Sequence, residues 1–125
     1  MIKSLSNLYV IDNCGGRKVK CIKLIRKEPW SYASVGDLIL VSVKSYRKII
    51  KNRKVKKNAL YLGLIVSTKK VINRFTGFSL SSLWNCVVLL HKDKTLIGKR
   101  IRGTVFSELR FKGFSRIVAI AENVI

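Results

Sequence analysis

Short apolar stretches of strand length recur along the whole chain, with turn-forming residues between them. The most apolar stretches cover residues 8–12, 38–44, 59–68 and 85–90. Residues 17–26 instead alternate basic and apolar positions, which is typical of a strand with one solvent-exposed face. That alternation slips near Ile22. None of the stretches is long and apolar enough to span a membrane as a helix, so no membrane insertion is expected.

Glycine-containing turns divide the apolar stretches. Gly15 and Gly16 follow the first stretch, and we expect at least one of them to adopt a positive φ, which glycine tolerates without strain. Residues 35–37 predict a turn in which Asp37 has a structural role. Residues 76–77 predict a hairpin turn. Many short strands separated by such turns favour a mainly-β fold, a small closed β-barrel, within one domain spanning residues 1–125.

The pattern changes near the C-terminus. Residues 98–103 predict an exposed basic loop. Residues 104–110 predict a short helix with Thr104 as its N-cap and Glu108 near its start. Residues 115–121 favour a final strand over a short helix.

Charge gives the first indication of function. The chain carries 26 basic residues against 6 acidic ones, a formal net charge of +20. Residues 44–57 hold eight Lys or Arg in fourteen positions without one carboxylate. A merely solvated surface normally mixes both signs, so a polyanion, most simply nucleic acid, is the expected partner. The other basic clusters lie in residues 17–27, 69–74, 92–102 and 110–116.

The carboxylates, the histidine and the cysteines of the chain give little support for an enzyme. The six carboxylates are scattered, His91 is the only histidine, and the three cysteines form no C-x-x-C pair. A zinc site needs closely spaced Cys or His ligands, so ordinary reduced thiols are the expected state of the cysteines. We therefore expect no enzyme activity, no metal and no cofactor.

Several motifs, taken in order, resemble one known family. They are residues 8–23 (LYVIDNCGGRKVKCIK), 32–39 (YASVGDLI), 54–57 (KVKK), 68–70 (TKK), 85–90 (NCVVLL), 97–105 (IGKRIRGTV) and 108–110 (ELR). Each motif alone is weak, but their collinear order over nearly the whole chain resembles the large-subunit ribosomal protein L-fourteen family.

The resemblance implies a five-stranded closed β-barrel over roughly residues 1–97 and a small α/β lobe over roughly residues 98–125. It implies a structural role in the large ribosomal subunit, on the face toward the small subunit. The implied partners are large-subunit rRNA, small-subunit rRNA at an intersubunit bridge, neighbouring large-subunit proteins and a ribosome-silencing factor.

Charge pattern and resemblance together assign two sets of residues. The first set is expected to bind rRNA: Asn13, Arg17, Lys18, Lys20, Lys44, Arg47, Lys48, Lys51, Arg53, Lys54, Lys56, Lys57, Lys69, Lys70 and Arg74. The second set is expected at the intersubunit or protein contact: Lys99, Arg100, Arg102, Thr104, Glu108 and Arg110.

Two competing classes stay open on the sequence alone. A stand-alone OB-like module would bind single strands through aromatics interleaved with charge on one barrel face, and the sequence does not place its aromatics so. Core packing is the expected role of most of them: Tyr9, Trp30, Tyr32, Phe75, Phe78 and Trp84. A membrane-surface protein would need a basic amphipathic helix, which the pattern lacks.

Composition also bears on location. The chain is rich in Lys, Ile, Asn and Leu, which suggests an AT-rich genome, and its N-terminus shows no presequence pattern. An organelle-encoded protein of the mitochondrial ribosome is the expected source, with a plastid or bacterial cytoplasmic ribosome as the alternative.

Overall fold

The computed structural model describes residues 2–28, 30–47 and 54–125. Three residues predicted to bind rRNA lie outside these ranges: Lys48, Lys51 and Arg53. The elements are β1 (Asn7–Val10), β2 (Gly16–Leu24), β3 (Leu38–Tyr46), β4 (Leu60–Ser67), β5 (Ile72–Asn73), β6 (Ser79–Leu80), β7 (Cys86–Leu90), β8 (Ile101–Val105), the 3-10 helix η1 (Ser107–Lys112), α1 (Ser115–Ile120) and β9 (Ala121–Val124).

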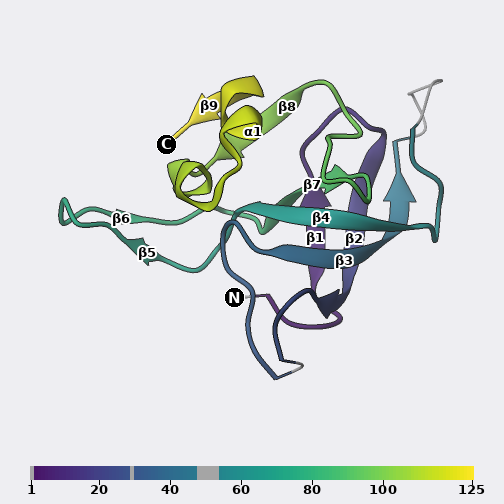
Figure 1. Cartoon of the computed structure of the whole chain (residues 1–125), viewed down its shortest axis with the longest axis horizontal. Helices are drawn as coiled ribbons and strands as arrows, with labels where there is room; N and C mark the ends of the chain where they lie inside the picture. The colour runs from purple at the N-terminus through teal and green to yellow at the C-terminus, as the bar shows by residue number, and fades with distance from the viewer. Residues whose placement is uncertain (1, 29, 48–53) are drawn as a thin grey trace.

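Five of the strands close into a barrel in the order β1-β2-β3-β4-β7. Neighbours pair antiparallel, except that β1 runs parallel to β7 where the barrel closes, with Tyr9 opposite Cys86 and Val10 opposite Val87. The predicted fold class, mainly β with a five-stranded closed barrel and a short C-terminal lobe, is confirmed (Figure 1). Among the described residues, no helix combines the length and the apolarity needed to cross a membrane.

Two hydrophobic cores explain why β4 and β7 read as unbroken apolar runs. One core fills the barrel interior, and Ile65, Val87 and Leu89 point into it. The other lies between the outer face of β4 and β7 and the C-terminal lobe, and it includes Val88 and Phe106. Both faces of β7, and of β4 from residue 63 to residue 67, are therefore buried, so period-two alternation disappears from their sequence.

Strand β2 keeps one wet face, as its alternation predicted. The parity slip near Ile22 is a register shift between Cys21 and Lys23 in the pairing with β3. A bulge adds one residue to one strand, and Ile22 becomes exposed there while Cys21 and Leu24 stay buried.

Strands β5 and β6 form a short hairpin that projects from the barrel (Figure 1). Gly77 turns it with a φ of 86°, which confirms the predicted turn. Phe75 and Phe78 flank that turn and are exposed. The expected core role of the aromatics is wrong for these two and for Trp30, Tyr32 and Trp84, which are also exposed. Branched aliphatic side chains and cysteines fill the small barrel instead.

The C-terminal lobe differs from its sequence prediction in four places. Residues 101–103 belong to β8 rather than to the predicted exposed loop, and Ile101 is buried. Thr104 is not a helix N-cap, because it lies in β8 and pairs with Asn123 of β9. The 3-10 helix starts later, after Phe106. Residues 115–120 are helical rather than extended, because Ile117 and Val118, adjacent in sequence, are both buried against the lobe. This packing overrides the local β-propensity.

The turn before β3 is confirmed, with Gly36 at a φ of 87°. The Asp37 carboxylate accepts hydrogen bonds from the Ser34 N–H at 2.7 Å and its hydroxyl at 3.1 Å. Lys27 and Lys112 lie 2.9 and 3.4 Å from it. Burial opposes ionisation of Asp37, but these donors outweigh burial and lower its pKa.

We expect Asp37→Asn to lower the free energy of unfolding by about 1 kcal/mol at pH 7. A carboxyl whose pKa is lower in the folded chain stabilises above its unfolded pKa and stops doing so as pH falls through the folded value. The deficit should therefore be smaller at pH 2 than at pH 7. Denaturant unfolding at both pH values measures it. Glu122→Gln changes an exposed carboxylate for which the described residues show no ion pair and should have little effect. An equal deficit at pH 2 would contradict the account.

Candidate nucleic-acid interface

One end of the barrel is organised around the turn between β1 and β2, residues 12–16. The Arg47 N–H donates to the Gly15 carbonyl at 2.8 Å, and the Lys54 N–H donates to the Cys14 carbonyl at 3.0 Å. The two described ends of the connection between β3 and β4 are thereby fixed to this turn. Gly15 has a φ of 102°, which confirms that one glycine of the pair is at positive φ. We call this region, residues 12–17, 44–47, 54–57 and 98–102, the basic end.

Asn13 joins the loop before β8 to the same turn. Its Oδ1 accepts hydrogen bonds from the Lys99 N–H at 2.7 Å and the Arg100 N–H at 3.1 Å. Its own N–H donates to the Arg100 carbonyl at 3.1 Å. A Cβ on Gly98 would lie 2.6 Å from the same Oδ1, so glycine is needed there. The side chain predicted to touch rRNA is occupied in positioning a neighbouring basic loop.

Asp12 stabilises the turn through hydrogen bonds to its buried carboxylate. It is 1% exposed, and its carboxylate accepts hydrogen bonds from the Leu89 N–H at 3.2 Å and the Cys14 N–H at 3.3 Å. Burial raises the pKa of Asp12, and the hydrogen bonds offset that only in part. This role could not be predicted from the sequence, because a contact with Leu89 leaves no local signal there.

The predicted rRNA ligands of the described chain lie mainly on the surface. Arg17 and Lys18 are exposed on β2, where Lys20 is half-buried, and Lys44 is exposed near the end of β3. Further exposed cations of this set are Lys54, Lys56, Lys57, Lys69 and Lys70, and Arg47 is half-buried.

Arg74, predicted to bind rRNA, also has partners within the protein. Its guanidinium lies 2.7 Å from the Glu108 carboxylate and also donates to the Ser107 hydroxyl and the Ile125 carbonyl. Burial alone would raise the pKa of Glu108, but Arg74 outweighs it and the pKa is lowered. The pair ties the connection before the hairpin turn to the C-terminal lobe.

Counter-charges are scarce. The ion pairs found among the described residues join Lys27 and Lys112 to Asp37 and Arg74 to Glu108, and none of them lies at the basic end.

Three residues of the second predicted set, the intersubunit or protein contact, lie at the basic end. Lys99 and Arg100 are exposed on the loop that Asn13 holds, and Arg102 is exposed on β8. Thr104 is half-buried on β8, and Arg110 is exposed in η1.

Aromatic side chains do lie among these cations, contrary to the sequence-based expectation. The rings of Tyr9 and Trp84 meet edge-to-face with centroids 4.9 Å apart. The Lys18 ammonium lies 5.4 Å from the Tyr9 centroid, and the Lys69 ammonium lies 5.6 Å from the Trp84 centroid. Both aromatics line a groove of about 1000 Å³, the Tyr9–Trp84 groove. Its other lining residues are Val10, Ile11, Asn13, Arg17, Tyr46, Arg47, Cys86 and Arg102.

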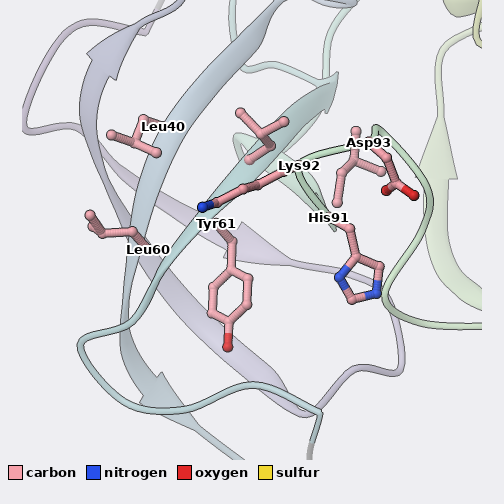
Figure 2. A pocket seen from close by; sticks show the side chains of 8 residues that line it. Leu40, Leu60, Tyr61, His91, Lys92 and Asp93 are labelled. Atoms are coloured by element: carbon pink, nitrogen blue, oxygen red, sulfur yellow. The ribbon is translucent and has the colours of Figure 1, made fainter.

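A second hollow, of about 990 Å³, lies over β3, β4 and the end of β7 (Figure 2). It is mainly apolar, with His91, Lys92 and Asp93 at its border, and Figure 2 shows the Lys92 amine and the Asp93 carboxylate turned to opposite sides. Asp93 accepts hydrogen bonds from the Thr95 N–H and hydroxyl. Within residues 2–28, 30–47 and 54–125, no group of three His, Cys, Asp or Glu side chains is placed to hold a metal ion.

Comparison with protein families agrees with this architecture. The family model described as "Ribosomal protein L14p/L23e" matches residues 1–125, the whole chain. A barrel with a strongly basic end and few counter-charges is typical of a protein that contacts RNA. The chain therefore belongs to the ribosomal protein L14p/L23e family and is a structural constituent of the large ribosomal subunit.

Proposed function

We propose that this protein anchors itself on large-subunit rRNA through the turn and the segments 44–47 and 54–57 of its basic end. The observation that carries the proposal is convergence: both basic segments are hydrogen-bonded to the turn, at Gly15 and Cys14, and Asn13 holds the adjoining loop before β8 beside them. Like charges gathered this closely repel one another in the free protein. An RNA backbone against them relieves that repulsion and releases counterions.

Recognition of the rRNA would depend more on the folded shape of the RNA than on its base sequence. Lys and Arg side chains reach phosphates, which position a protein but carry no sequence information. Folded RNA offers phosphates and 2′-hydroxyls in a fixed geometry, and a rigid barrel can match that geometry. Lys48, Lys51 and Arg53, outside the described residues, would extend the same contact along the chain.

We propose a second contact on the adjoining surface, formed by Lys99, Arg100 and Arg102 with Thr104, Glu108 and Arg110. This surface would face the small subunit, contribute to an intersubunit bridge with small-subunit rRNA and receive neighbouring proteins or a ribosome-silencing factor. The exposed position of Lys99, Arg100 and Arg102 supports it. Glu108 would contribute indirectly, because its ion pair with Arg74 holds the C-terminal lobe in position.

The triple charge reversal Lys99→Glu, Arg100→Glu and Arg102→Glu tests this division. We expect the variant to enter the large subunit, because the turn, Lys54, Lys56 and Lys57 are unchanged. We also expect it to reduce subunit joining several-fold, because like charges then face small-subunit rRNA. Gradient sedimentation of free and joined subunits measures both. A variant that never enters the large subunit would make this loop part of the anchor and defeat the division.

The composition, rich in Lys and Ile, supports a mitochondrial ribosome as the site of action, and a plastid or bacterial ribosome is the alternative. Fractionation followed by identification of this chain among mitochondrial large-subunit proteins tests the assignment. Recovery only from plastid or cytoplasmic ribosomes would overturn it.

The alternative function is that of a stand-alone OB-like nucleic-acid-binding module, and the aromatic groove on a closed barrel is the observation that favours it. Sedimentation at rising salt separates the two. An integrated subunit component stays with the large subunit at salt concentrations that strip loosely bound nucleic-acid-binding proteins. Loss of the chain together with such proteins would favour the alternative.

A further inference from the structure

We infer that the Tyr9–Trp84 groove binds one unpaired base of the rRNA, stacked on Trp84 beside Tyr9, with the flanking phosphates held by the cations around the groove. This inference deepens the proposed function and rests on it, since it names which part of an RNA this basic surface takes. It concerns a different contact from the phosphate anchoring of residues 54–57.

The topology places the two rings on the outer face of the barrel. Leu8 and Val10 of β1 are buried in the interior core, so Tyr9 between them points outward. Tyr9 is paired with Lys18 on β2 and with Cys86 on β7. Trp84, two residues before Cys86, therefore reaches the same place from the other side.

Exposure and shape favour a planar ligand. Trp84 is 51% exposed, although a large aromatic side chain gains most by burial. Its ring meets Tyr9 edge-to-face rather than stacked, so at least one flat face of the indole has no Tyr9 ring against it. The groove, at about 1000 Å³, reaches the upper end of the roughly 300–1,000 Å³ usual for small-ligand sites. It has room for a nucleotide.

Charge identifies the ligand as nucleic acid. Arg17, Arg47 and Arg102 line the groove, and its described lining includes no carboxylate. Lys18 and Lys69 add two more cations beside the rings. Stacking on aromatics combined with backbone cations is how proteins hold single-stranded nucleic acid. In a duplex the bases are stacked on each other, so only a base in a loop, bulge or end can enter.

Fluorescence of Trp84 tests the inference. The chain has two tryptophans, so the full-length Trp30→Phe protein leaves Trp84 as the only one. The probes are oligoadenylate, a blunt RNA duplex of the same length and inorganic polyphosphate, all at low salt. Binding of each is scored separately by displacement of a labelled RNA. We expect oligoadenylate to quench Trp84 and the other two to bind without quenching it. Equal quenching by polyphosphate, or binding of oligoadenylate with no quenching, would overturn the inference.

A matched pair of variants gives the energetic test. Trp84→Leu should weaken oligoadenylate binding by on the order of 10-fold, whereas Trp84→Phe, which keeps a ring, should stay within about 3-fold. Neither should change the salt dependence, because every phosphate-binding cation is retained. Equal affinity of the two variants would overturn the inference. Should Trp84→Leu fail to fold, the quenching result decides alone. A wild-type protein that binds none of the three probes would instead contradict the proposed function itself.

Discussion

Replacing Lys54, Lys56 and Lys57 with Gln should weaken binding to large-subunit rRNA on the order of 10- to 100-fold at low salt. The three side chains are exposed, and each is expected to displace counterions from a phosphate. The slope of log affinity against log salt should therefore become shallower by about one unit for each phosphate that is no longer neutralised. Adding Lys51→Gln and Arg53→Gln should flatten it further. Filter binding or anisotropy over a series of salt concentrations measures both quantities.

The matched control removes the same number of charges at the other end of the barrel, with Lys3, Lys23 and Arg26 changed to Gln. Strand β2 separates the two ends, since it runs from Gly16 in the turn to Leu24. The control should keep most of its affinity and an almost unchanged slope. If both triple variants lose affinity equally, net charge alone determines binding and the basic end has no special role.

Asp12→Ala should lower the free energy of unfolding by roughly 2–4 kcal/mol, a large share of the stability of a small domain. The change removes the acceptor of two hydrogen bonds, from Leu89 and Cys14, in a site that is almost fully buried. The orphaned N–H groups then have no water to replace the carboxylate. The variant should also bind rRNA less tightly, because the turn that gathers the basic segments loosens.

Asp93→Ala is the control for this prediction. Asp93 also accepts a hydrogen bond from a backbone N–H in a turn, that of Thr95, but it is exposed. Water can take its place, so a decrease of about 0.5 kcal/mol or less is expected. Chemical denaturation of both variants measures the difference. Equal decreases would show that the buried position of Asp12 contributes nothing.

The barrel could be predicted from the sequence because its signals are local. Strand-length apolar runs, turn glycines and even the parity slip at Ile22 all report on a few neighbouring residues. The lobe could not, because its local signals disagree with its packing. Ile117 and Val118 suit a strand, yet they complete the core under a six-residue helix. Thr104 suits an N-cap, yet it pairs within β8 and β9.

The candidate site could likewise be predicted only in part from the sequence. The charge runs that mark the basic end are visible in the sequence. The roles of Asp12, Asn13 and Arg74 are not, because each depends on a partner far along the chain: Leu89, Lys99 and Glu108. The Tyr9–Trp84 pair could not be predicted for the same reason, since only closure of the barrel between β1 and β7 brings the two rings together.

A cryo-EM map of the large ribosomal subunit with this chain in place tests the central claim most directly. The account predicts rRNA phosphate oxygens within about 4 Å of the Lys54, Lys56 and Lys57 ammonium groups, and of the Arg17 guanidinium on the same end of the barrel. A map in which the turn at residues 12–16 and these side chains face open solvent, with rRNA held by another face of the protein, would contradict it.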